Sequence, residues 1–343
     1  MAALKQTSTH KTNIYYPELD GLRFLAFLVV LIHHSPSAAG VPLWRIVNDY
    51  GWVGVDLFLC LSAYLFAKLL YVEFQEKGSI NIRYFYLRRI LRIWPLYFFF
   101  FGIMLVYSVL IKGWHTAILI RSLGMLSFTD NLFSMVYGYN QAIEFSGHLW
   151  TISYEEQFYL IIPWALLILY TLKKETIFYI LSIATLIGML LRAVFIYYEV
   201  GLPDLWVFPF THYESILGGL IVGLGLLDQH VQKISSWVLL IGGLIALWLV
   251  TTLPNIDATQ WKLMLTYPLV GIGTSLLLFA TIKGGLGPIS VLLKNKVLGY
   301  LGKISYGLYV YHLIGIRLAS NLVDPWISPD RLLVHPAAIL VTA

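Results

Sequence analysis

Long apolar stretches recur along the chain, and they restrict its possible folds more than any other feature of the sequence. Nine of them come close to the ~20 residues that a helix needs to cross a bilayer. A tenth begins near Leu332 and runs only to Ala343, so we expect a last membrane helix that is truncated. The nine predicted spans are 22–38, 51–72, 94–111, 148–170, 176–198, 208–227, 235–253, 264–282 and 299–320.

Charged residues are too few to cover a soluble domain. They make up 12% of the 343 residues, while hydrophobic residues make up 59%. Soluble domains carry about 25% charged residues. The sequence therefore predicts an all-α fold, a polytopic bundle of about ten transmembrane helices with the last one truncated. Since no internal repeat divides the chain, we expect a single domain over residues 1–343.

The positive charges predict how this bundle lies in the membrane. With the N-terminus inside, 16 of the 23 lysines and arginines fall in inner segments and 7 in outer ones. Cytoplasmic loops carry the excess of positive charge, so we expect a multi-pass protein of the plasma (inner) membrane with a cytoplasmic N-terminus. The formal charge of +5 is spread over short loops and forms no basic domain, which argues against nucleic-acid binding.

The first span carries two ionisable side chains, each of which costs a few kcal/mol to insert and therefore needs a reason. Arg23 and His34 are eleven positions apart, which places them on one helical face about 16 Å apart along the axis. A cation near the inner end and a titratable group near the outer end suit a long substrate lying along the helix. The alternative is two unrelated interface residues, with Arg23 reaching lipid headgroups.

A dense set of arginines follows the second span, in a segment that the sequence predicts to be a loop. Arg89 and Arg92 are three residues apart and hence neighbours on one helical face. Paired guanidinium groups match phosphate oxygens, which favours a nucleotide phosphate as ligand. Lipid headgroups are the alternative partner, and they explain Arg83 and Arg88 well.

The fourth predicted span opens with several polar side chains. His148 and Glu155 are seven residues apart and share a helical face, with Tyr159 one turn further. The outer half of this helix thus offers a carboxylate that could orient an imidazole and raise its basicity. Solvated glutamates at the membrane interface are the alternative.

Three further features admit structural explanations. Asp56 lies near the middle of the second span, where a helix-packing hydrogen bond would explain it as well as a catalytic role would. His312 lies in the middle of the ninth span, where a lone histidine is more often a packing group. A set of glycines predicts close helix packing: Gly218, Gly219, Gly223 and Gly225.

Several other chemistries are excluded by the sequence. It contains no nucleophile elbow, no phosphate-binding or dinucleotide-binding glycine motif, and no HExxH or CxxC pattern. The single cysteine, Cys60, cannot form an intramolecular disulfide. The adjacent His33 and His34 cannot place both rings on one helical face, so we expect no metal site.

Five segments, taken in order, resemble the signatures of acyltransferase family 3. They are Leu19–His34, Gly54–Ser62, Arg88–Tyr97, His148–Tyr159 and Ile304–His312. The resemblance covers nearly the whole chain from about Tyr16 to the ninth span. Two departures stand out. Ala63 occupies a position where the family usually has glycine, and the family's usual arginine or glutamate near the last helix is missing.

The resemblance implies a membrane O-acyltransferase. Such an enzyme moves an acyl group, here expected to be acetyl, from acyl-CoA to a hydroxyl of a cell-envelope polysaccharide or lipid-linked sugar. Acetyl-CoA or another acyl-CoA would be the donor substrate, membrane lipids would surround the protein, and no metal would take part. A multi-pass transporter or flippase of an envelope precursor is the competing class, because intramembrane ionisable residues also mark permeation paths.

The resemblance also implies roles for individual residues. Arg89, Arg92 and Arg23 would bind the acyl-CoA. His34 would act as general base or briefly carry the acyl group, and we favour the base. Glu155 would hold its imidazole, and Arg23 would complete the catalytic set. The residues expected to surround these groups are Asp56, Ser62, His148, Tyr159 and His312.

Overall fold

The computed structural model describes residues 16–36, 41–139, 142–256 and 260–323, and all regular structure in these ranges is helical. Four segments are long and apolar enough to cross a membrane: α3 (Val53–Lys77), α4 (Ile82–Lys112), α8 (Lys174–Tyr197) and Trp261–Lys283, which combines η3 (Trp261–Leu265) with α13 (Thr266–Lys283). The predicted all-α class is thus confirmed. The count of about ten spans stays a prediction, and the tenth lies outside the described residues.

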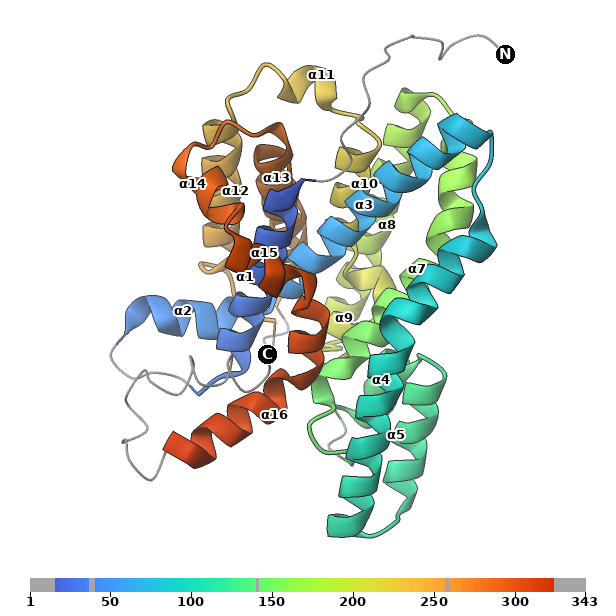
Figure 1. Ribbon diagram of the computed structural model, residues 1–343, viewed down its shortest axis with the longest axis vertical. Coiled ribbons are helices and arrows are strands. Elements are labelled where there is room, and N and C mark those ends of the chain that lie inside the picture. The colour runs from blue at the N-terminus through green and yellow to red at the C-terminus, as the bar shows by residue number, and fades with distance from the viewer. Residues whose placement is uncertain (1–15, 37–40, 140–141, 257–259, 324–343) are drawn as a thin grey trace.

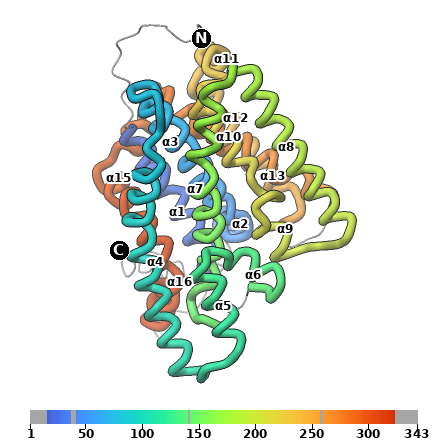
Figure 2. Tube along the Cα trace, turned by 90° about the vertical axis from the view of Figure 1, so that its right-hand side faces the viewer, coloured from blue at the N-terminus to red at the C-terminus, as the bar shows by residue number. Residues whose placement is uncertain are grey.

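The remaining elements are shorter or more polar. They are α1 (Pro17–His34), α2 (Pro42–Tyr50), α5 (Thr116–Leu126), α6 (Asp130–Tyr137), η1 (Gly147–Leu149), α7 (Trp150–Leu169), α9 (Asp204–Val207), η2 (Pro209–Thr211), α10 (Glu214–Gly223), α11 (Asp228–Val231), α12 (Ser236–Val250), α14 (Pro288–Leu293), α15 (Lys296–Lys303) and α16 (Ser305–Val323). Figures 1 and 2 show α4 descending along the molecule and α5 returning beside its lower end.

Helix α3 lies at the centre of the bundle and packs against α1, α10 and α13. Close approach to α3 requires glycine at two contacts. A Cβ on Gly54 would lie 2.4 Å from the carbonyl oxygen of Ala26, and one on Gly219 would lie 2.2 Å from that of Cys60. The predicted glycine packing is therefore confirmed for α10. Gly225 differs, because it follows α10 and adopts a positive φ of 63°.

The segment of clustered arginines is helical, so the predicted loop before residue 94 is wrong. The Asn81 side chain accepts a hydrogen bond from the backbone N–H of Tyr84 at 2.9 Å and caps the start of α4. Helix α4 then continues through Pro95, which membrane helices tolerate more readily than soluble ones. One helix therefore carries the arginines and the apolar span together.

The predicted span 208–227 is broken in the structure. Only α10 within it is α-helical, and η2 and a bend precede it. The buried Arg192 of α8 occupies the break, where it donates to the carbonyl oxygen of Thr211 at 2.8 Å and pairs with Glu214. Backbone groups freed inside a membrane need such partners. The predicted span 299–320 is also divided, between α15 and α16.

Candidate active site

Two cavities lie end to end along α1, α3, α7 and α16. The first, which we call the arginine cavity, is lined by Arg23, Ser62, Arg89, Arg92, Glu155 and Tyr159 among others and holds about 940 Å³ of empty space, its open mouth included. The second, the histidine cavity, is lined by His33, His34, His148, Trp52, Trp150 and Trp206 among others and holds about 1190 Å³. The predicted site residues therefore divide between two spaces.

The arginine cavity gathers three cations from two helices. Arg23 belongs to α1 and pairs with Asp20 at 3.1 Å, while Arg89 and Arg92 lie one turn apart on α4. Arg92 repels both of the other guanidinium groups. Within the described chain neither Arg89 nor Arg92 forms an ion pair with a carboxylate. Arg89 and Arg92 repel each other and form no ion pair in the described chain, so they favour an anionic ligand beside the Glu155 carboxylate of the same cavity.

Aromatic rings hold Arg89 in place. Its Cζ atom lies 4.9 Å from the centroid of the Phe66 ring and 6.0 Å from that of Tyr159. The Tyr159 hydroxyl donates to Oε2 of Glu155 at 2.5 Å, and Ser62 lines the same cavity. The attraction between a cation and a ring face fixes the guanidinium while leaving its N–H groups free for a ligand.

The neighbouring glutamate has a structural role. The Trp94 indole N–H of α4 donates to Oε2 of Glu156 at 3.1 Å and ties α4 to α7. Of the two adjacent glutamates, therefore, Glu155 faces the arginine cavity and Glu156 joins two helices.

His34 ends α1 and is exposed to solvent through the histidine cavity. Its Nδ1 lies 3.1 Å from the carbonyl oxygen of Val30, one turn earlier. Since a carbonyl only accepts, this geometry assigns the proton to Nδ1 and leaves the lone pair on Nε2. An imidazole in this tautomer can take a proton at Nε2.

His148 and His312 lie beside His34. The ring centroid of His312 is 4.8 Å from that of His34 and 4.6 Å from that of His148. His312 is fully buried, and its Nδ1 donates to the carbonyl oxygen of Tyr309 at 2.6 Å. In the part of the chain that the structure describes, neither ring nitrogen of the buried His148 has a hydrogen-bond partner. A buried polar group without a partner is uncommon and marks a candidate functional site.

Asn48 of α2 fixes the end of α1 on which His34 lies. Its amide donates to the carbonyl oxygens of Ile32 and Ser35, each at 2.8 Å. The backbone carbonyl oxygen of Asn48 lies 2.6 Å from Nδ1 of His33. These bonds satisfy carbonyl groups that a helix end leaves unpaired. Asn48 was not predicted as a site residue, because its only signal in the sequence is its place after the first span.

The predicted contact between Glu155 and His34 is wrong. Glu155 bonds to Tyr159 in the arginine cavity, whereas the Val30 carbonyl orients the His34 ring. The predicted shared face of His148 and Glu155 fails for a related reason. His148 belongs to the 3-10 turn η1 and precedes α7, so the helical periodicity does not extend across both residues.

Asp56 lines neither cavity. Its Oδ1 accepts hydrogen bonds from Nε2 of His212 at 2.9 Å and from the Ser215 hydroxyl at 2.8 Å. These contacts join α3 to the segment around α10, which is the helix-packing alternative that the sequence left open. The expected place of Asp56 around the catalytic groups stays a prediction.

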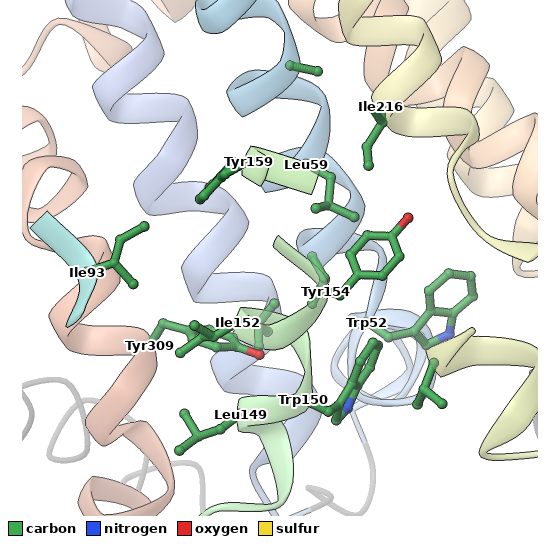
Figure 3. Packing of buried hydrophobic residues seen from close by; sticks show 14 of the residues in the cluster. Trp52, Leu59, Ile93, Leu149, Trp150, Ile152, Tyr154, Tyr159, Ile216 and Tyr309 are labelled. Atoms are coloured by element: carbon green, nitrogen blue, oxygen red, sulfur yellow. The ribbon is translucent and has the colours of Figure 1, made fainter. Parts of the chain in front are cut away.

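The two cavities share a wall that the sequence did not reveal. Val55, Thr151 and Tyr309 line both spaces and come from α3, α7 and α16. Figure 3 shows Tyr309 directed from α16 toward α7 beside Ile152, with Tyr159 higher in the view and Trp150 lower. Neither Thr151 nor Tyr309 has an unusual sequence context, since hydroxyl-bearing residues are common in both helices.

No metal-binding geometry occurs in the ranges that the structure describes. These residues contain no group of three or more histidine, cysteine, aspartate or glutamate side chains placed to hold a metal ion. The clustered imidazoles stack edge to face and do not converge on one point. The arrangement is therefore suited to proton transfer, with cation-lined space for an anion on the other side of the wall.

Known proteins share this sequence over most of its length. A Staphylococcus aureus (strain COL) protein, provisionally named an O-acetyltransferase, is 30% identical over 340 residues, covering 94% of this chain and 54% of that protein. The peptidoglycan O-acetyltransferase OatA of Listeria monocytogenes is 26% identical, covering 94% of this chain and 52% of its own. The chain spans about half the length of these relatives. No solved structure matches it significantly.

The family comparison covers the two cavities and all of the elements that line them. The family described as "Acyltransferase domain" matches residues 16–343. The match includes every segment that the sequence analysis compared with acyltransferase family 3. The chain belongs to this family of acyltransferases.

Proposed function

We propose that the protein is a membrane O-acetyltransferase that moves an acetyl group from acetyl-CoA to a hydroxyl of a cell-envelope glycan. One observation carries the proposal: an arginine-lined cavity and a histidine-lined cavity meet at a wall formed by the same three side chains. The names of the relatives OatA support O-acetyl transfer as the reaction. We further propose that the N-terminus is cytoplasmic, in which case the arginine cavity opens toward the cytoplasm.

The donor would bind in the arginine cavity. Arg23, Arg89 and Arg92 offer forked donors to phosphate oxygens, and neither Arg89 nor Arg92 forms an ion pair with a carboxylate in the described chain. A side pocket sharing Phe66, Leu69 and Arg89 extends this space toward Tyr84 and Arg88. Such an extension has room for the nucleotide end of coenzyme A, while the narrow pantetheine arm points along α3 toward the wall.

The acceptor would bind in the histidine cavity. Trp52, Trp150 and Trp206 present apolar ring surface, against which the C–H face of a sugar packs, and Asn255 adds a polar contact. Nε2 of His34 would take the proton of the acceptor hydroxyl, and the hydroxyl oxygen would attack the thioester carbon. The C–S bond then breaks, and the departing coenzyme A thiolate takes the proton back from the imidazolium.

The test is transfer of radiolabelled acetyl from acetyl-CoA to envelope glycan by protein in liposomes. We expect base-labile ester label on the glycan, and we expect His34→Ala to abolish it while acetyl-CoA still binds. His33→Ala is the matched control, because His33 lines the same cavity but bonds to the Asn48 carbonyl. Retained transfer in His34→Ala would refute the role of the base. Movement of an unmodified precursor without ester formation would favour a transporter.

A further inference from the structure

Three polar contacts, which share the protons of two hydroxyl groups, join the side chains of the wall between the cavities. The Tyr309 hydroxyl lies 2.6 Å from Oγ1 of Thr151 and donates to the carbonyl oxygen of His148, 3.1 Å away. Oγ1 of Thr151 lies 3.0 Å from the same carbonyl. Both side chains are buried. The His148 carbonyl, in the middle of η1, thus accepts from α16 and from α7 where the two cavities meet.

This closed wall creates a problem for the proposed reaction. The cations lie on one side of it, and the imidazole of His34 lies on the other. A thioester carbon must come within bonding reach of the acceptor oxygen, so the acyl end of the donor has to pass Tyr309. Val55, Thr151 and Tyr309 line both spaces, so these three side chains lie between the cavities where they adjoin.

We propose that Tyr309, fastened by Thr151, is the side chain that the acyl group must displace, and that the opening it leaves limits the size of the acyl group transferred. When closed, the tyrosine ring also keeps water of the histidine cavity away from the thioester. The inference rests on the proposed function for the identity of the donor. The barrier itself is inferred only from the two cavities and from the hydrogen bonds in the wall between them.

The barrier can be tested without any enzymatic turnover. A cysteine at Ser62 reports on the arginine cavity, and one at Tyr139 marks the side on which the histidine cavity opens. Both are placed in a Cys60→Ala background, and a membrane-impermeant thiol reagent is applied to each side of the membrane in turn. With Tyr309 present, we expect Ser62→Cys to react from its own side and to be protected from the side that labels Tyr139→Cys.

Substitution of the tyrosine should remove this protection. We expect Tyr309→Ala to raise labelling of Ser62→Cys from the histidine-cavity side several-fold, while labelling from its own side stays unchanged and shows that the protein is folded. Tyr309→Phe keeps the ring and should keep most of the protection. Thr151→Val keeps the volume, loses the hydroxyl and should give an intermediate value. Equal labelling from both sides in the parent protein, or no increase in Tyr309→Ala, would overturn the barrier.

The size limit is measured separately with acyl donors of different length. The ratio of butyryl to acetyl transfer should rise about tenfold or more in Tyr309→Ala and stay near the parent value in Tyr309→Phe. An unchanged ratio would overturn the role in size selection. A protein that shows the labelling change but transfers no acyl group would keep the barrier and refute the proposed function.

Discussion

The arginine cavity and the histidine cavity are built in different ways, although they share a wall. The first takes its polar side chains from the interior of long helices, where Arg89, Arg92 and Glu155 follow helical spacing. The second is formed where helices end: His34 closes α1, His148 belongs to the turn η1, and Trp206 belongs to the short helix α9. Regular helices thus present the cations, and interruptions in helices present the imidazoles.

This difference suits the ligands that we propose for the two cavities. A phosphate needs charges at fixed spacing, which one helix supplies because residues three apart lie on one face. An acceptor hydroxyl needs several neutral groups from different directions. In a membrane, irregular backbone is tolerated where it is buried in protein or lines a cavity, so the second site lies at helix ends.

The strongest test of the histidine cavity is His148→Phe. The substitution keeps a ring of similar size but removes two nitrogens that have no partner among the described residues. If His148 relays protons with His34, we expect the rate of acetyl transfer at saturating substrates to fall about 100-fold. Radiolabel transfer measures the rate, and acetyl-CoA binding should stay unchanged. Full activity would show that His148 only packs.

The arginine cavity is tested by Arg89→Ala with Arg83→Ala as its matched control. Loss of one charged hydrogen bond of about 1.5–3 kcal/mol should raise the KM for acetyl-CoA about 10- to 100-fold with a smaller change in kcat. Arg83 is exposed on the same helix and lines neither the arginine cavity nor its side pocket, so its substitution should change KM much less. Equal effects of the two substitutions would remove the distinction between ligand and lipid contacts.

Glu155→Gln tests whether Glu155 affects donor binding or the catalytic step. Glutamine still accepts the hydrogen bond of Tyr159 but removes a carboxylate that attracts all three arginines. We expect acetyl-CoA to bind several-fold more tightly, with kcat little changed. Steady-state kinetics at varied acetyl-CoA separate the two quantities. A large loss of kcat at unchanged affinity would instead restore the role in catalysis that the sequence suggested.

Asp56→Asn should have the smallest effect on transfer and a clear effect on stability. Loss of a buried hydrogen bond that leaves its partner unsatisfied costs about 1–3 kcal/mol. The buried Asp56 side chain accepts such bonds from His212 and Ser215. We expect a lower thermal unfolding midpoint in detergent and near-normal activity of the folded fraction. The control, Asp49→Asn, breaks an exposed pair with Arg45 at 3.8 Å and should change stability by at most about 1 kcal/mol.

Helical spacing explains which of the predicted neighbours lie close together in the structure. Arg89 and Arg92 lie together because residues three apart share one face of α4, and Tyr159 lies about one turn from Glu155 on α7. The same rule failed for His148, since it applies only within one continuous helix. It also failed for the segment 208–227, where the Arg192 pair with Glu214 stabilises a break that no local pattern marks.

By itself, the sequence determined the membrane-type composition, the all-helical class and the family, because these depend on hydrophobic length and local spacing. It also determined which ionisable groups had to be kept from lipid. Only the tertiary structure decided that His312 contacts both His34 and His148, that Glu155 faces the arginines, and that Thr151 and Tyr309 lie between the cavities. Those contacts join helices far apart in the chain, and their positions are fixed by packing of whole helices, which local residue patterns do not encode.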